Sequence, residues 1–195
     1  MTPDHYLVID FEATCCDQGS VPRDQMEIIE IGAVLVDAAS LQPIDEFQSF
    51  VRPVRHPVLT PFCRQLTSIT PEDVAQAPLF GAMLARLTTW LYRDASFVFG
   101  SWGDYDLNQL RQDCLFHHLP YPLGAPHLNL KRLMGERQSL TRKPGLGDAL
   151  RLAGLEFEGT VHRGIDDARN IVRLLPYILG EERLPSAPGT DRRRR

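Results

Sequence analysis

Two acidic residues in the stretch IDFEAT, residues 9–14, are the first candidates for chemistry in this sequence. Side chains alternate between the two faces of a strand, so Asp10 and Glu12 would project to one side and Phe11 to the other. Two carboxylates this close repel each other, and a divalent cation is the usual remedy when the strand is buried. An isolated D-x-E is more often the solvated acidic face of an edge strand, but the apolar run before Asp10 favours a buried strand.

A second candidate pair lies in HRGIDDARN, residues 162–170, where His162 stands five positions before Asp167. Asp167 falls in the first turn of the expected last helix, and Gly164 lets the loop before it turn closely past its neighbours. A histidine can exchange protons near neutral pH. Taken alone, the stretch is better explained as a capped helix behind a loop histidine of no consequence.

A third acid lies in GDYDLNQL, residues 103–110, at an expected turn from strand to helix. Asp106 opens an amphipathic helix, where a carboxylate can cap backbone N–H groups and face the carboxyl end of the sheet. Capping alone would explain it. Asp104 competes for either role, because it lies in the same turn.

The hydrophobic pattern predicts the elements that must position these residues. Strands are expected over 6–11, 27–37, 46–51 and 96–102, and the first three would form an antiparallel meander. Helices are expected over 79–92, 105–119, about 131–136 and about 166–179, with the segments 127–130 and 145–155 between them. This order predicts an α/β fold in which helices flank a mixed sheet.

Length and composition indicate one globular domain. Of the 195 residues, 43% are hydrophobic and 24% are charged. This length and hydrophobic content are enough to form a buried core. The formal net charge of -4 means that any contact with nucleic acid must come from local basic patches. The four cysteines show no C-x-x-C spacing, and no secretion signal or membrane-spanning run is visible. A cytoplasmic protein with no membrane partner is therefore expected.

Together, Asp10-x-Glu12, the aromatic-Asp106-Leu step and His162-x4-Asp167 resemble the DEDDh 3′-to-5′ exonucleases, which have a ribonuclease H-like fold. The resemblance covers about residues 5–180. Within this superfamily the sequence is similar to the Eri-type (enhanced RNAi) exoribonucleases and their bacterial relatives. The blocks that carry this similarity are DFEATC, EIIEIGAVLV, HPVLTPFCRQLTSIT, GSWGDYDL and HRGIDDARNI.

The resemblance implies a five-stranded mixed sheet with three antiparallel strands and further parallel strands. It implies an exonuclease domain over residues 1–184, and the arginine-rich remainder, 185–195, has the composition of a disordered tail. One departure is the extra residue in GSWGDYD. Asp106 is assigned as the third acid in preference to Asp104, because an aromatic residue precedes it and leucines follow it.

The resemblance also implies a two-metal mechanism, with two Mg²⁺ ions for which Mn²⁺ could substitute. Asp10 would bridge both cations, Glu12 and Asp167 would complete the site that holds the nucleophilic water, and Asp106 would hold the second cation. His162 would be the general base that deprotonates this water. Hydrolysis would release a nucleoside 5′-monophosphate.

Binding of the substrate's 3′ end is predicted at positions that match the family's apolar and backbone contacts. Leu66 and Thr67 lie in LTSIT, and Phe11 and Ala13 flank the metal strand, although core packing is an alternative for Leu66 and the better explanation of Phe11. Arg163 is a candidate for phosphate contact.

Two further residues have expected roles outside the chemistry. Glu30 lies in the middle of the second strand, beside the motif strand, and is expected to make a structural hydrogen bond. Trp102 could stack on a base, although burial in the core is the better expectation.

The function expected from these motifs is 3′-to-5′ exonuclease activity on single-stranded 3′ ends, of RNA in preference to DNA. The RNA preference rests on the family resemblance alone, because no motif visibly reads a 2′-hydroxyl. Two alternatives stay open: a DNA-directed, proofreading-like exonuclease, and a non-catalytic module that binds nucleic acid. The presence of all five catalytic positions argues against the second.

Overall fold

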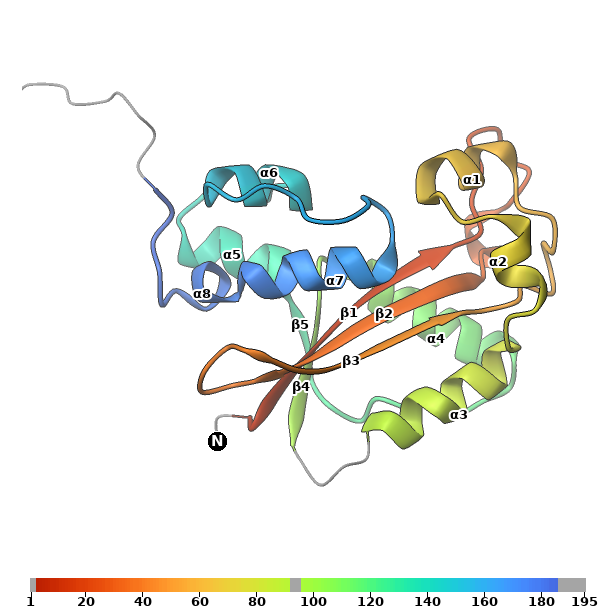
Figure 1. The fold of residues 1–195 in the computed structure, drawn as a ribbon, viewed down its shortest axis with the longest axis horizontal. Helices are drawn as coiled ribbons and strands as arrows, with labels where there is room; N and C mark the ends of the chain where they lie inside the picture. The colour runs from red at the N-terminus through yellow and green to blue at the C-terminus, as the bar shows by residue number, and fades with distance from the viewer. Residues whose placement is uncertain (1–2, 92–95, 186–195) are drawn as a thin grey trace, which may run out of the picture.

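The computed structural model of this chain describes residues 3–91 and 96–185, and it forms one sheet with helices on both faces (Figure 1). The strands are β1 (His5–Ala13), β2 (Ile28–Asp37), β3 (Pro43–Phe50), β4 (Phe97–Ser101) and β5 (His127–Asn129). The helices are α1 (Pro61–Thr67), α2 (Pro71–Ala75), α3 (Phe80–Leu91), α4 (Tyr105–Phe116), α5 (Leu130–Arg137), α6 (Leu146–Leu152), α7 (Gly164–Arg173) and α8 (Leu175–Leu179), with a 3₁₀ turn, η1, at Arg23–Gln25.

The sheet has the strand order β3-β2-β1-β4-β5. The pairs β1–β2 and β2–β3 are antiparallel, whereas β1–β4 and β4–β5 are parallel. The predicted mixed sheet of three antiparallel strands with further parallel strands is therefore confirmed. β1 lies at its centre, as the apolar run before Asp10 predicts.

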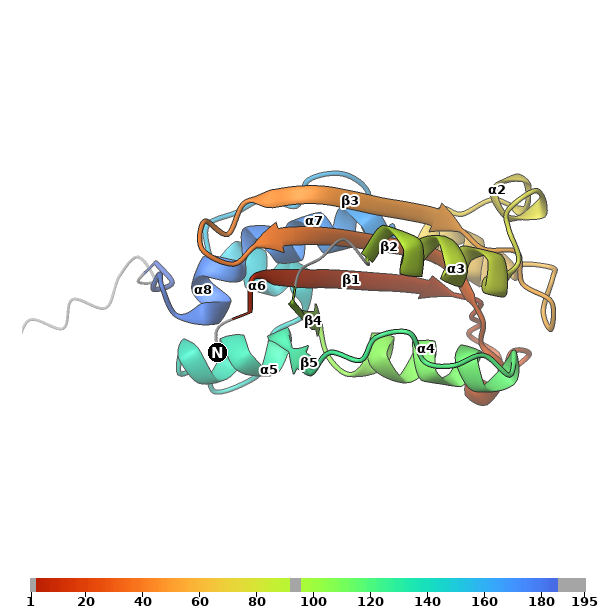
Figure 2. The ribbon, with the colours of Figure 1, turned by 90° about the horizontal axis from the view of Figure 1, so that it is seen from below.

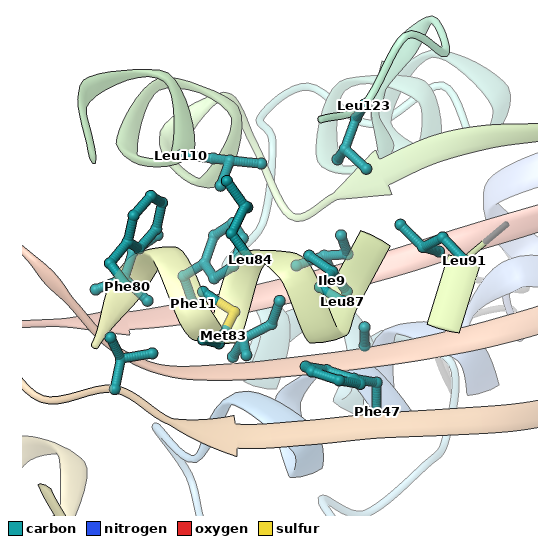
Figure 3. Close-up of a cluster of buried hydrophobic side chains, with 14 of the residues drawn as sticks. Ile9, Phe11, Phe47, Phe80, Met83, Leu84, Leu87, Leu91, Leu110 and Leu123 are labelled. Atoms are coloured by element: carbon teal, nitrogen blue, oxygen red, sulfur yellow. The ribbon is translucent and has the colours of Figure 1, made fainter. Parts of the chain in front are cut away.

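Two large hydrophobic cores lie between the helices and the sheet, and a smaller one packs Ile29 of β2 with α1 and α2. One core packs α3 and α4 against the face that carries Ile9 and Phe11 of β1, and Figure 3 shows its α3 side chains lying across the strands. The other packs α5, α6, α7 and α8 against the opposite face, which carries Val8. Figure 2 shows α3 in front of the strands and α7 behind them. Alternation along β1 therefore assigns each of its side chains to one helical layer.

α7 lies unusually close to the sheet because glycine stands on both sides of the contact. A Cβ atom on Gly32 of β2 would lie 2.0 Å from the backbone nitrogen of Ile165, and one on Gly164 would lie 2.9 Å from the carbonyl oxygen of Asp10. Neither position has room for a side chain. The backbone of α7 therefore begins directly against β1 and β2.

The buried Glu30 of β2 fixes this contact. Its carboxylate accepts hydrogen bonds from Arg163 Nε at 3.0 Å, from the Gly164 backbone N–H at 3.2 Å and from Gln48 Nε2 at 2.7 Å. The structural hydrogen bond expected of Glu30 is confirmed, and it ties the start of α7 to the sheet.

The last helix differs from its prediction. The single helix expected over about 166–179 is wrong: α7 ends at Arg173 and α8 begins at Leu175. Pro176 causes the break, because it has no N–H to donate and its ring collides with the carbonyl four residues earlier.

The sequence pattern assigned no helix to the segment that contains α1 and α2. Each of these helices begins at a Thr-Pro pair, in which the threonine side chain caps the helix and proline occupies its first turn. In the sequence, the pairs Thr60-Pro61 and Thr70-Pro71 could have indicated where these two helices begin.

Residues 186–195 of the predicted tail lie outside the described residues. Within the described residues, no helix combines the length and the apolar character that crossing a membrane requires.

The contact between α7 and β2 predicts a sharp difference between two glycine substitutions. Gly32→Ala should lower the free energy of unfolding by about 3 kcal/mol, because its methyl group must displace the backbone of α7. Gly124→Ala is the matched control, since an added Cβ there meets nothing within 4 Å. Urea unfolding would measure both. Equal stability of the two variants would contradict the close contact.

Candidate active site

The strand register places the first two acids beneath α7. Ile9 and Phe11 face α3, so Asp10 and Glu12 point to the opposite side of β1, as the alternation predicts. Across the β1–β2 pair, Asp10 lies opposite Gly32, and a bulge follows Glu12 where β1 ends. The missing side chain at Gly32 leaves the space that α7 occupies beside these acids.

All five predicted catalytic residues line one cleft of about 590 Å³ at the carboxyl end of β1. Asp10 and Glu12 come from β1, Asp106 from α4, Asp167 from α7, and His162 from the loop before α7. Three segments that are far apart in the sequence, at residues 10–12, 106 and 162–167, therefore meet at this cleft.

Asp106 is held against the end of β1. It is the second residue of α4, and its Oδ1 accepts a hydrogen bond from the Phe11 backbone N–H at 2.9 Å. Asp104, its competitor, does not line the cleft, and its side chain is 60% exposed to solvent. The structure therefore brings Asp106, and not Asp104, to the other acids.

His162 and Asp167 are joined through the backbone. The His162 N–H donates to Asp167 Oδ2 at 3.0 Å, and His162 itself adopts a left-handed conformation with φ of 60°. This conformation is uncommon for a residue with a side chain, and it is found most often at tight turns and functional sites. The ring stays about half exposed, with Nδ1 4.0 Å from Glu12 Oε1.

Burial makes the ionised form of this acid cluster costly. Desolvation is the largest cause that raises the pKa values, to about 9 for Glu12, about 7 for Asp167 and about 6 for Asp106. The pKa of Asp10 is raised well above its usual range, by burial first and then by the negative charges of Asp106 and Asp167. The hydrogen bond from Phe11 works in the other direction at Asp106.

The donor set fits a divalent cation. One ligand atom each from Glu12, His162 and Asp167 lie within 4.8 Å of one another. Among the described residues, the ion pairs of arginine involve other acids, and the basic side chain nearest these four carboxylates is the His162 ring, 4.0 Å from Glu12. Hard cations prefer such oxygen ligands, and metal binding would relieve the repulsion.

The predicted substrate-binding residues fall into two groups. Phe11, Ala13 and Leu66 line the cleft, and Leu66 is partly exposed there. The structure does not place Thr67 and Arg163 in it. The buried Thr67 hydroxyl donates to the Cys63 carbonyl at 2.8 Å, and the Arg163 side chain is occupied by Glu30, so structural partners account for both.

Several residues of the cleft had no signal in the sequence. Trp102 and Tyr105 lie in the motif around Asp106, but the other contributors come from loops and from the start of α6, and tertiary structure alone brings them to the site. They are Cys15, Met26, Leu146, Gly147, Phe157 and Val161. They make one part of the cleft largely apolar beside the acidic part.

With this geometry in place, comparison with known proteins decides the family. The sequence model described as Exonuclease matches residues 7–175. The chain is 32% identical to the crystal structure of the nuclease domain of 3'hExo, described as a DEDDh family member bound to rAMP. That match covers 92% of this chain and 93% of the other, with a TM-score of 0.84. The chain belongs to the DEDDh exonuclease family.

Two further relatives are also named as exonucleases that act from the 3′ end. The chain is 33% identical to 3'-5' exoribonuclease 1 of Homo sapiens, over 90% of this chain and 52% of that protein. It is 30% identical, with a TM-score of 0.83, to a structure of 3'-end specific recognition of a histone mRNA stem-loop by 3'-exonuclease, covering 92% of this chain and 64% of that one. The chain thus spans about half the length of the curated relatives it matches first. Divalent-metal dependence is a property of the DEDDh family, and the residues present fit it.

The raised pKa values predict how the stability of the metal-free protein changes with pH. Carboxyls in the unfolded chain lose their protons near pH 4, whereas the folded cluster holds protons up to the pKa of about 9 at Glu12. The folded state therefore binds more protons in this interval, and stability should fall as pH rises from about 4 to about 9. Thermal unfolding in EDTA across this range would measure the decline.

Asp167→Asn should make this decline shallower, while Glu156→Gln, a change to an exposed acid, should leave it unaltered. Adding Mn²⁺ should raise the melting temperature most at high pH, because the cation binds the ionised cluster of the folded state. Stability that is independent of pH in EDTA would contradict the description of the cluster.

Proposed function

We propose that this chain is a metal-dependent 3′-to-5′ exonuclease that removes nucleoside 5′-monophosphates from the 3′ ends of RNA. One observation carries the proposal: Asp10, Glu12, Asp106, Asp167 and His162 converge on a single cleft. The family relationship supports this reaction. The names of the relatives, one of which is described in complex with rAMP and another with a histone mRNA stem-loop, support RNA as the substrate.

The four carboxylates would hold two divalent cations, Mg²⁺ for preference and Mn²⁺ as a substitute. When bound, these cations would neutralise phosphate charge and lower the pKa of the attacking water. The family resemblance implies that Asp10 would serve both cations, and the charges of Asp106, Asp167 and Glu12 all act on its pKa. The hydrogen bond from Phe11 to Asp106 Oδ1 keeps that carboxylate turned toward β1.

His162 would accept the proton of the attacking water. Its ring lies at the edge of the acidic cluster and is half exposed, so that water can reach it, and its backbone is fixed through Asp167. The new bond joins the water oxygen to phosphorus, and the bond from phosphorus to the 3′ oxygen of the preceding nucleotide breaks. The terminal nucleotide then leaves with its 5′-phosphate.

The apolar part of the cleft would receive the base and sugar of that terminal nucleotide. This part of the cleft is lined by Met26, Leu66, Trp102 and Phe157. These side chains offer apolar surface without a set of hydrogen-bond donors specific to one base. Such a lining accepts any base. The enzyme should therefore degrade 3′ ends with little sequence preference.

The function is tested with purified protein and single-stranded RNA and DNA oligonucleotides labelled at the 5′ end. With Mg²⁺ we expect a ladder that shortens from the 3′ end, faster on RNA, with nucleoside 5′-monophosphate as the product. EDTA should abolish the cleavage. Faster degradation of DNA would favour the proofreading-like alternative, and binding without cleavage would favour the non-catalytic one.

Substitutions at two neighbouring acids should differ in their effect on turnover in this assay. Asp106→Asn should lower turnover on the order of 10²- to 10³-fold with little loss of fold, because it removes a charge that faces the cations. Asp104→Asn, the matched control, should stay near wild type, since its carboxylate lies outside the cleft. An inactive Asp104 variant beside an active Asp106 variant would show that the third acid is assigned wrongly.

His162→Ala should lower the rate on the order of 10²- to 10⁴-fold, the usual contribution of a positioned base. Mn²⁺ binding measured by calorimetry should survive in this variant, because the four carboxylates remain. Near-normal turnover of His162→Ala would mean that the histidine takes no part in proton transfer.

A further inference from the structure

An exposed arginine side chain lies at one edge of the active-site cleft. Arg23 begins the 3₁₀ turn η1. Its guanidinium carbon lies 5.2 Å from the centre of the Tyr105 ring, and Tyr105, which precedes Asp106 in the chain, lines the cleft. A cation at this distance over an aromatic ring is attracted to the face of the ring. The ring therefore holds the positive charge of Arg23 beside the cleft.

The backbone that carries Arg23 is anchored to α4. Gln112 Nε2 donates to the Arg23 carbonyl at 3.3 Å and to the Met26 carbonyl at 2.9 Å. The buried Gln109 also donates to the Met26 carbonyl, at 2.9 Å. Met26 in turn lines the cleft. α4 therefore fixes η1, and with it the position from which the Arg23 side chain reaches Tyr105.

The N–H donors of the Arg23 guanidinium are free. Within residues 3–91 and 96–185, this group takes part in no ion pair and donates no hydrogen bond. In this it differs from Arg163, whose side chain is occupied by Glu30. A guanidinium presents five N–H donors in a planar fork that suits phosphate oxygens. Arg23 can therefore bind a phosphate group without giving up another partner.

In the proposed reaction, most of the substrate's phosphates lie outside the metal site. The scissile phosphate faces the four carboxylates, and the terminal base and sugar occupy the apolar part of the cleft. The phosphates of the preceding nucleotides must then pass over the edge of the cleft. Two divalent cations only balance the charge of four carboxylates, so the metal site has no excess positive charge to attract these phosphates. A cationic side chain at the edge supplies that attraction.

We infer that Arg23 binds a phosphate of the nucleotides that precede the terminal one, and that the Tyr105 ring positions its guanidinium for this contact. The inference rests on the proposed function and adds a substrate contact outside the metal cluster. A phosphate contact positions the strand without selecting a base. Because it is present both before and during the reaction, its loss should raise KM and leave kcat nearly unchanged.

Two substrates separate this contact from the chemistry. A single-stranded RNA oligonucleotide carries the preceding phosphates, whereas the p-nitrophenyl ester of uridine 5′-monophosphate carries only the scissile one. With Mg²⁺, Arg23→Gln should lower kcat/KM on the RNA about 10-fold, because a hydrogen bond between charged groups is lost. On the ester, the variant should match the wild type within about twofold, since the metal site is unchanged.

Arg111→Gln is the matched control. Arg111 is also exposed, and its guanidinium carbon lies 5.5 Å from the centre of a tyrosine ring, but that ring belongs to Tyr121, outside the cleft. This variant should keep the wild-type kcat/KM on both substrates. Thermal unfolding checks that both variants fold.

The salt dependence of KM on RNA tests the contact without the ester. Each phosphate contact with a single strand adds about 0.7 to the slope of log affinity against log salt concentration. Arg23→Gln should lower the slope by about this amount, and Arg111→Gln should leave it unchanged. This measurement decides the question if the ester is too poor a substrate.

The inference is overturned if Arg23→Gln degrades RNA as the wild type does, with the same salt dependence. It is also overturned if the variant loses as much activity on the ester as on RNA, because Arg23 would then act by shaping the cleft. Both results presuppose a wild type that shortens RNA from its 3′ end. A wild type without this activity would instead overturn the proposed function, and the inference with it.

Discussion

The backbone contact between α7 and the centre of the sheet is the constraint on which the site depends. Gly32 and Gly164 allow the first turn of α7 to lie directly on β1 and β2, and Glu30 fastens it there through Arg163 and the Gly164 N–H. Because Asp167 lies in that first turn and His162 just before it, the contact decides their distance from Asp10 and Glu12. A side chain at either glycine would have to lie between the two backbones and would hold the helix farther from the sheet.

The carboxylates of this region have two different kinds of surroundings. Glu30 is neutralised by Arg163 and satisfied by further donors, as a buried structural charge must be. Asp10, Glu12, Asp106 and Asp167 lie nearby without such a partner. Burial raises their pKa values, and repulsion by neighbouring acids raises those of Asp10, Glu12 and Asp167 further. Strongly perturbed acids gathered in a cleft are typical of functional sites. The fold therefore bears a cost in stability that a bound cation would offset.

Much of this could be predicted from the sequence because several signals are local. The apolar run before Asp10 indicated a central strand, alternation put Asp10 and Glu12 on one face, and the spacing of His162 and Asp167 matched a loop that enters a helix. The aromatic residue and leucines around Asp106 distinguished it from Asp104. The five-stranded mixed sheet came from the family resemblance, and the order of its strands was not predicted, since pairing between distant strands leaves no local pattern.

Other features depend on tertiary contacts or on signals that periodicity does not contain. Arg163 looked like a phosphate contact because nothing in the sequence shows that Glu30, 133 positions away, binds it. Thr67 faces inward because α1 places it there, and α1 is too short for a helical period to be visible. The loop residues that line the apolar part of the cleft, such as Met26 and Phe157, meet only in the folded chain. The cytoplasmic location and the disorder of the arginine-rich tail stay predictions.

The central claim is that these four carboxylates form a site for divalent cations. The most direct measurement is anomalous X-ray diffraction from crystals of the protein soaked in Mn²⁺, which locates the cations independently of any assay. The account predicts two manganese peaks within coordination distance of Asp10, Glu12, Asp106 and Asp167, with Asp10 contacting both. A cleft without manganese at saturating Mn²⁺, or manganese bound only at other acids, would contradict it.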